Sequence, residues 1–140
     1  MPDPATTVLV VDDNVDHAEF LRVAGRRVAP HLSFRAVYDG QQALDYLDGV
    51  PPFDDRTQHP YPSLVLLDLM MPKLDGFGVL ARLRNVTWEN PVPVVVLTTS
   101  SNPVDESRAL ALGADAFHSK PAGVDDLGAL FQDIVSRWLS

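Results

Sequence analysis

The chain has 140 residues, 46% of them hydrophobic, which suits one domain with a sizeable core and excludes a disordered chain. The lack of cysteine excludes disulfides, thiolate metal sites and cysteine nucleophiles, and a formal net charge of −8 without a basic cluster argues against nucleic-acid binding. No apolar run approaches the roughly 18 residues of a membrane span, and the first residues lack the pattern of a signal peptide, so we expect a cytoplasmic protein that does not bind membranes.

Five short apolar runs alternate with segments of helical period along the whole chain. The runs cover residues 8–11, 33–37, 64–67, 92–97 and 116–117. This alternation predicts an α/β fold, namely a doubly wound, five-stranded parallel sheet with helices on both faces. The fifth run is the weakest signal, because residues 115–118 suit a loop equally well on propensity alone.

Several residues mark where the helices between these strands begin and end. Asn14 and Asp75 can each cap a helix, and Asn102-Pro103 can start another that Gly113 ends. The last helix has the clearest apolar stripe, formed by Leu127, Leu130, Phe131, Ile134, Val135 and Trp138.

One segment interrupts the rhythm between the second helix and the third strand. Residues 49–62 contain four prolines and predict a loop insertion. Phe53 and Tyr61 either anchor this loop to the domain, which is the favoured interpretation, or present it to a partner. The organisation that we predict is a single domain over residues 1–140, with an N-terminal tail over residues 1–6 and no output domain.

Charged and polar side chains follow the ends of four predicted strands. Asp12-Asp13 follow the first strand, Asp68 the third, Thr98-Thr99 the fourth, and Lys120 lies just past the fifth. Because parallel strands end at one edge of the sheet, we expect these groups to converge. Neighbouring carboxylates repel one another unless positive charge lies among them, and Mg²⁺ bound directly by Asp13 and Asp68, together with Lys120, would supply it.

A carboxylate beside a metal ion and an ammonium group can accept a phosphoryl group. Asp68 would attack, while Mg²⁺ and Lys120 stabilise the charge on the equatorial oxygens, and the product would be an aspartyl phosphate. A hydroxyl at Thr98 or Thr99 would then bind the phosphoryl oxygens and draw its loop inward, and the ring of Phe117 could change rotamer in response. These steps describe a switch.

The chain resembles the receiver domain of bacterial two-component response regulators over essentially its whole length. The segments that carry the resemblance stand in the family's order: Asp12-Asp13, Leu66-Leu67-Asp68-Leu69-Met70-Met71-Pro72-Lys73-Leu74-Asp75-Gly76, Val94-Val95-Val96-Leu97-Thr98 and Lys120-Pro121. The resemblance implies a flavodoxin-like (βα)5 fold and a signalling protein that takes a phosphoryl group from a sensor histidine kinase. It implies no enzyme activity beyond self-phosphorylation and self-dephosphorylation.

The resemblance also assigns roles to individual residues. Asp68 would be the phosphoacceptor, Asp13 a metal ligand, Asp12 a ligand acting mainly through water, and Met70 the donor of a backbone carbonyl to the metal. Thr98 would be the switch hydroxyl, Phe117 the switch aromatic residue, and Lys120 the phosphate-binding cation, with Lys120-Pro121 as a candidate cis peptide. On residue type alone, Phe117 suits a position in the core equally well.

The separation from Asp13 to Asp68 is longer than in most members of the family, and the proline-rich loop accounts for the excess. Together with the sequence Leu97-Thr98-Thr99-Ser100, this insertion resembles the stand-alone regulators that are partners of phytochrome-type histidine kinases. That subfamily implies a bacteriophytochrome kinase as partner, a downstream protein that the sequence does not identify, and self-association as a homodimer.

Two other functions compete with this interpretation. An aspartate-dependent phosphatase needs a second acid two positions after its nucleophile, but Met70 and Asn14 hold those positions after Asp68 and Asp12. A degenerate receiver that binds partners without phosphate is disfavoured because every required side chain is present. The scattered histidines His17, His31, His59 and His118 are interpreted as surface residues rather than ligands.

Overall fold

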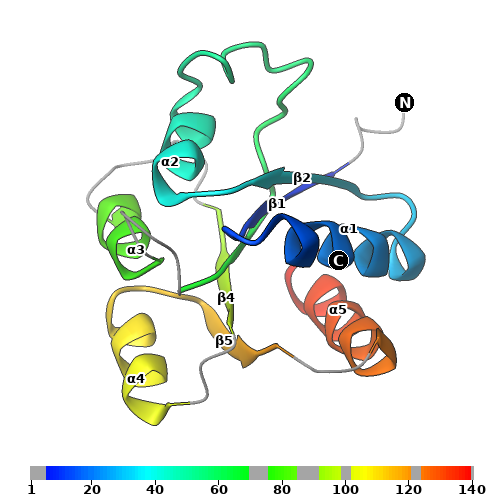
Figure 1. Ribbon diagram of the computed structural model, residues 1–140, viewed down its shortest axis with the longest axis vertical. Helices are drawn as coiled ribbons and strands as arrows, with labels where there is room; N and C mark the ends of the chain where they lie inside the picture. The colour runs from blue at the N-terminus through cyan, green and yellow to red at the C-terminus, as the bar shows by residue number, and fades with distance from the viewer. Residues whose placement is uncertain (1–5, 70–75, 85–91, 99–101, 121–123, 140) are drawn as a thin grey trace.

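The computed structural model describes residues 6–69, 76–84, 92–98, 102–120 and 124–139. In these residues strand and helix alternate five times along the chain (Figure 1). The strands are β1 (Thr7–Val11), β2 (Ser33–Val37), β3 (Leu64–Leu67), β4 (Val94–Thr98) and β5 (Ala116–Ser119). The helices are α1 (Val15–Val28), α2 (Gly40–Asp48), α3 (Gly76–Arg84), α4 (Pro103–Ala111) and α5 (Val124–Trp138).

All five strands form one parallel sheet in the order β2-β1-β3-β4-β5. The register brings the last residue of β1, Val11, opposite Val37 at the end of β2 and Leu67 at the end of β3. The strands therefore finish level with one another, and the residues that follow them share one edge. The predicted doubly wound fold is confirmed.

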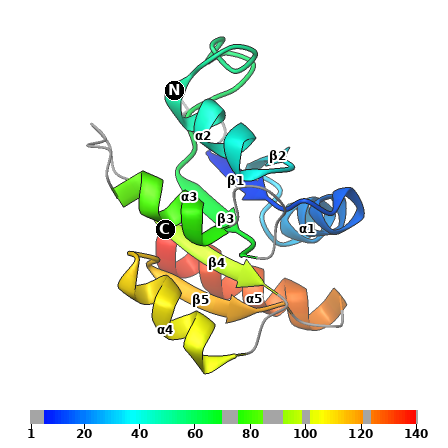
Figure 2. The same cartoon turned by 60° about the vertical axis from the view of Figure 1, so that its left-hand side comes forward.

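Helices cover both faces of the sheet. Helices α2, α3 and α4 lie on one side and α1 and α5 on the other, as the two views show (Figure 1, Figure 2). The apolar strands serve both layers by alternation: Leu9 and Val11 belong to the α2–α3–α4 core cluster, and Val8 and Val10 to the α1–α5 core cluster. Because helices cover both faces, we expect a functional site at the edge formed by the carboxyl ends of the strands.

The helix starts follow the capping signals where the structure describes them. The side-chain oxygen of Asn14 accepts a hydrogen bond from the His17 N–H at 3.1 Å, and that of Asn102 accepts one from the Val104 N–H at 2.9 Å, with Pro103 as the first helical residue. Asp75, the predicted cap of the third helix, lies outside the described residues.

Two strands differ in detail from what the sequence suggested. β4 begins at Val94 rather than at residue 92, because Pro93 has no N–H to donate to the ladder, and it extends to Thr98. β5 forms as the edge strand beside β4, although its residues are half-buried or exposed. Because this strand is only partly buried, its sequence lacks the continuous apolar run that marks the inner strands.

Arg56 organises the insertion between α2 and β3. Its guanidinium donates to the backbone carbonyls of Tyr46 at 2.8 Å, Leu47 at 3.0 Å and His59 at 3.2 Å. The Tyr46 and Leu47 carbonyls belong to the last turn of α2, where helical N–H donors run out, and the Tyr46 carbonyl also accepts from the Gly49 N–H at 3.2 Å. One arginine thus caps the helix and ties the loop to it.

Aromatic side chains complete this anchor, as predicted for Phe53 and Tyr61. Both pack against the α2–α3–α4 core cluster, and the hydroxyl of Tyr46 donates to the Pro60 carbonyl at 2.8 Å. His59 was expected at the surface, but its ring is half-buried and forms T-shaped contacts with the rings of Tyr46 and Phe53. A histidine inside an aromatic cluster has no distinctive signature in sequence.

Candidate functional site

Three carboxylates meet at the carboxyl edge of the central strands. Asp12 and Asp13 follow β1 and Asp68 follows the neighbouring strand β3, and one oxygen of each lies within 4.8 Å of the others. Asp12 and Asp68 are buried, whereas Asp13 is exposed. The Asp68 N–H donates to the Val11 carbonyl at 2.9 Å, which continues the strand ladder and fixes the acid at the site.

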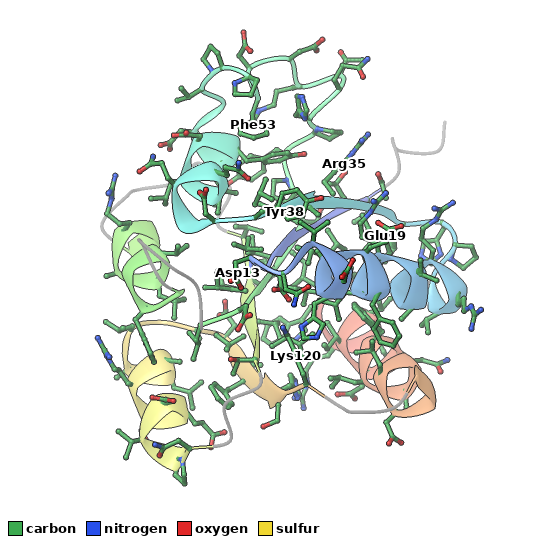
Figure 3. All side chains as sticks on the ribbon, in the orientation of Figure 1. Asp13, Glu19, Arg35, Tyr38, Phe53 and Lys120 are labelled. Atoms are coloured by element: carbon green, nitrogen blue, oxygen red, sulfur yellow. The ribbon has the colours of Figure 1, made fainter. Side chains whose placement is uncertain are left out.

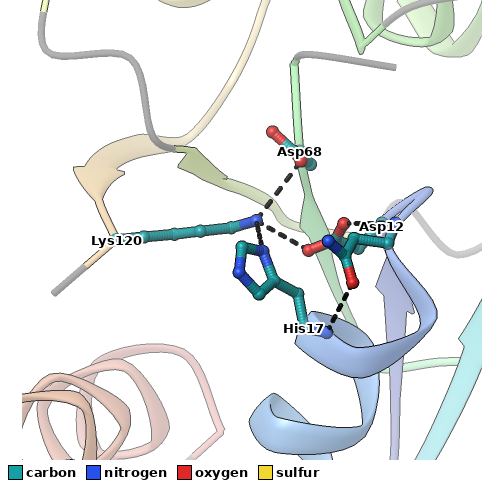
Figure 4. Close-up of polar contacts among 5 residues, drawn as sticks. Asp12, His17, Asp68 and Lys120 are labelled. Carbon is teal, nitrogen blue, oxygen red and sulfur yellow. Dashed lines mark hydrogen bonds and ion pairs between the residues drawn. The ribbon is translucent and has the colours of Figure 1, made fainter. Parts of the chain in front are cut away.

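An ammonium group lies among these acids although it comes from the far end of the chain. The Nζ atom of Lys120 is 2.7 Å from an oxygen of Asp12 and 3.3 Å from an oxygen of Asp68 (Figure 4). The Lys120 N–H donates to the Thr98 carbonyl at 2.7 Å, so the end of β4 positions the lysine. Figure 3 shows Asp13 and Lys120 at this edge, with Phe53 far away in the insertion. The predicted spatial grouping is thus present.

The donor set suits a hard divalent cation. Carboxylate oxygens are the ligands that Mg²⁺ prefers, and Mg²⁺ is usually bound by one or two of them with water completing the shell. Three carboxylates and one ammonium leave two negative charges unbalanced, which one divalent ion would neutralise. Exposed Asp13 lies on the side from which an ion can enter. Met70, whose carbonyl was expected to contribute, lies outside the described residues.

The two predicted switch residues lie on neighbouring strands. Thr98 is the last residue of β4 and its side chain is fully buried. Phe117 lies in β5, partly buried, and packs against the α2–α3–α4 core cluster. These positions do not show whether Thr98 and Phe117 move on phosphorylation, so their switch roles stay predictions. Thr99 and the Lys120-Pro121 peptide bond involve residues outside those described.

His17 also lies at the site, although its sequence context predicted only a surface residue. Its imidazole Nδ1 lies 3.5 Å from the Nζ of Lys120 (Figure 4). The available signal was position: His17 stands three residues after the Asn14 cap, in the first turn of the helix that follows Asp12-Asp13. Residue type alone gave no reason to separate it from the other histidines.

The family model for the response regulator receiver domain matches residues 8–132. The chain belongs to the response regulator receiver family. This domain is a signalling component of two-component systems, and the family assignment predicted from the sequence is confirmed.

Individual receiver proteins show how close the similarity is. The probable methanogenesis regulatory protein FilR2 of Methanothrix harundinacea is 34% identical over 132 residues, which are 94% of this chain and 83% of that protein. The chain spans less than half the length of several other related regulators. Their additional parts therefore say nothing about this receiver.

Solved structures of similar receivers include regulators of light signalling. Response regulator RPA3017, in red light signaling of R. palustris, is 35% identical with a TM-score of 0.89, covering 96% of this chain and 94% of that one. The phosphorylated cyanobacterial phytochrome response regulator RcpA is 29% identical with a TM-score of 0.86, covering 97% and 95%. Response regulator Rcp1 in its Mn²⁺-bound form is 30% identical with a TM-score of 0.79, covering 96% and 95%.

In the part of this receiver that the structure describes, no helix has both the length and the apolar character needed to cross a membrane.

Proposed function

We propose that this receiver accepts a phosphoryl group on Asp68 from a sensor histidine kinase, in a reaction that depends on Mg²⁺. The observation that carries the proposal is the position of the Lys120 ammonium between the buried carboxylates of Asp12 and Asp68. A buried acid near two other acids and beside a fixed cation costs stability unless a ligand balances the charge, so we interpret the arrangement as a site for phosphoryl transfer rather than for packing.

The chemistry is a displacement at phosphorus. A carboxylate oxygen of Asp68 forms a bond to phosphorus while the bond from phosphorus to the kinase's imidazole nitrogen breaks. The electron pair of that bond goes to the imidazole nitrogen, which takes up a proton from solvent. Lys120 stabilises the negative charge on the phosphoryl oxygens. Mg²⁺ held by Asp13 and Asp68, with Asp12 acting through water and the Met70 carbonyl contributing, would supply further neutralisation of that charge.

Phosphorylation would alter the end of β4 and the adjacent surface. The proposed step is a hydrogen bond from the Thr98 hydroxyl to a phosphoryl oxygen, which draws the chain after β4 towards Asp68. Phe117 lies on the strand beside β4, so its ring would adjust to the space that Thr98 leaves. A downstream protein would recognise the changed face.

The partners follow from the same proposal. The similarity to regulators whose names refer to phytochrome and red light supports a phytochrome-type histidine kinase as the donor. The acidic composition supports a protein target rather than nucleic acid. We also propose that the protein forms a homodimer and is located in the cytoplasm. Its catalytic activity would be limited to its own phosphorylation and dephosphorylation.

The proposal is tested by phosphoryl incorporation from a small donor such as acetyl phosphate. The wild-type protein should incorporate one phosphoryl group in the presence of Mg²⁺ and none after chelation. Asp68→Asn should incorporate none, because the amide is not a nucleophile.

Asp54→Asn is the matched control, since Asp54 is an exposed aspartate of the insertion. It should react like the wild type. Equal incorporation by Asp68→Asn and wild type would contradict the proposal, and steady release of phosphate from a generic phosphomonoester would favour the phosphatase alternative instead.

A further inference from the structure

His17 contacts the lysine of the site from the helix side. The residue lies in the first turn of α1, where its N–H donates to the side-chain oxygen of Asn14 at 3.1 Å. Its Nδ1 lies 3.5 Å from the Nζ of Lys120 (Figure 4). The helix start thus fixes the backbone that carries the imidazole, and the ring reaches the ammonium at the rim of the site.

The chemistry of the two groups decides how they interact. An ammonium group has three hydrogens to donate and no lone pair, so a hydrogen bond between the two groups requires the ring nitrogen to be the acceptor. Nδ1 is then unprotonated and any proton of the neutral ring is on Nε2. In the part of the chain that the structure describes, three acceptors face the Lys120 ammonium: the carboxylates of Asp12 and Asp68 and the imidazole of His17.

These three acceptors differ in what else they do. Asp12 and Asp68 are buried acids of the proposed metal and phosphoryl site, so their interaction with the ammonium weakens when a divalent ion or a phosphoryl group takes up their charge. His17 is exposed and uncharged in the acceptor form. It keeps its lone pair for Lys120 while the two acids change partners.

We propose that His17 is a positioning residue that holds the Lys120 ammonium in place for capture of the phosphoryl group. The inference rests on the proposed function, because it concerns the same reaction at Asp68. An acid at position 17 would add a competing charge to the site, and a permanent cation there would repel Lys120. A neutral acceptor avoids both effects.

The test is the rate at which a small phosphodonor modifies Asp68 at saturating Mg²⁺. His17→Leu removes the acceptor and should slow the reaction about threefold to tenfold, the range for one ordinary intramolecular hydrogen bond. His17→Asn places an amide oxygen near the former Nδ1 and should stay within about twofold of wild type. His31→Leu is the matched control, since His31 is exposed in the loop before β2, and it should not change the rate.

A spectroscopic measurement reports the contact independently of activity. The imidazole nitrogen resonances of His17 should shift when Lys120→Met removes the ammonium, and those of His31 should not. The inference is overturned if His17→Leu reacts at the wild-type rate, if His17→Asn is as slow as His17→Leu, or if the His17 resonances ignore Lys120→Met. If wild-type protein takes up no phosphoryl group on Asp68, the proposed function fails, and the inference falls with it.

Discussion

Replacing Lys120 with methionine removes the positive charge from the acid cluster while keeping much of the side chain's length. The lysine side chain is 10% exposed, and those of Asp12 and Asp68 are 1% and 6% exposed. The variant therefore leaves two buried carboxylates facing each other, with exposed Asp13 beside them. We expect Lys120→Met to be less stable than wild type when no divalent ion is present.

The expected loss can be estimated from the two ion pairs. At an effective dielectric constant of about 20, pairs separated by 2.7 Å and 3.3 Å attract by roughly 6 and 5 kcal/mol before desolvation is counted. Desolvation offsets much of this, and removing one partner of a buried pair typically costs about 3–5 kcal/mol. At about 3 °C per kcal/mol for a domain of this size, the unfolding temperature should fall by roughly 9–15 °C.

Divalent ions should reverse part of this loss. Mg²⁺ held by Asp13 and Asp68 would no longer be repelled by the ammonium, so it should raise the unfolding temperature of Lys120→Met more than that of wild type. The assay is thermal unfolding with chelator and with Mg²⁺. Arg82→Met, at an exposed position on α3, is the control and should change stability by no more than about 0.5 kcal/mol. An unfolding temperature equal to wild type without Mg²⁺, or an equal response to Mg²⁺, would refute the reasoning.

Two further predictions concern the framework of the site and the insertion. A Cβ at Gly76 would lie 2.5 Å from the Asp68 carbonyl oxygen and 2.6 Å from the Leu69 Cα, so Gly76→Ala should cost about 1–3 kcal/mol in urea unfolding. Gly128→Ala, where the nearest atom would be 3.8 Å away, should instead stabilise α5 by about 0.5–1 kcal/mol, and equal effects at the two glycines would contradict the packing argument. Burial raises the pKa of the Tyr46 hydroxyl above 10.0, against the opposing charges of Arg35 and Arg56, so the stability that this proton provides is present below about pH 10 and lost as pH rises through the folded pKa. Tyr46→Phe should therefore lose stability less steeply than wild type above pH 10 in urea unfolding, and an unchanged slope would count against this assignment.

The sequence predicted the sheet well where the strands are buried on both faces. Runs such as Leu64–Leu67 are continuous and apolar because both sides of the strand are packed, and this pattern has few alternatives. β5 was harder to predict because it lies at the edge, with half-buried and exposed residues. The capping residues Asn14 and Asn102 were predictable because the capping interaction is local.

The grouping of the site residues was predictable because level strand ends impose it. Asp12, Asp13, Asp68 and Lys120 follow three different strands, and the parallel topology brings them to one edge. The contact of His17 was not predicted, since it depends on the direction in which the first turn of α1 leaves β1. The packing of Arg56 was missed for a similar reason: side-chain interactions within an irregular loop have no sequence periodicity.

The central claim, that Asp68 receives the phosphoryl group, is tested most directly by locating the modification in the protein. The wild-type receiver would be treated with acetyl phosphate and Mg²⁺, the acyl phosphate reduced with borohydride, and the altered residue identified by mass spectrometry of peptides. We predict that the reduced residue is at position 68 and that its formation requires Mg²⁺. Modification at another residue, or labelling of Asp68 that is unaffected by chelation, would contradict the account.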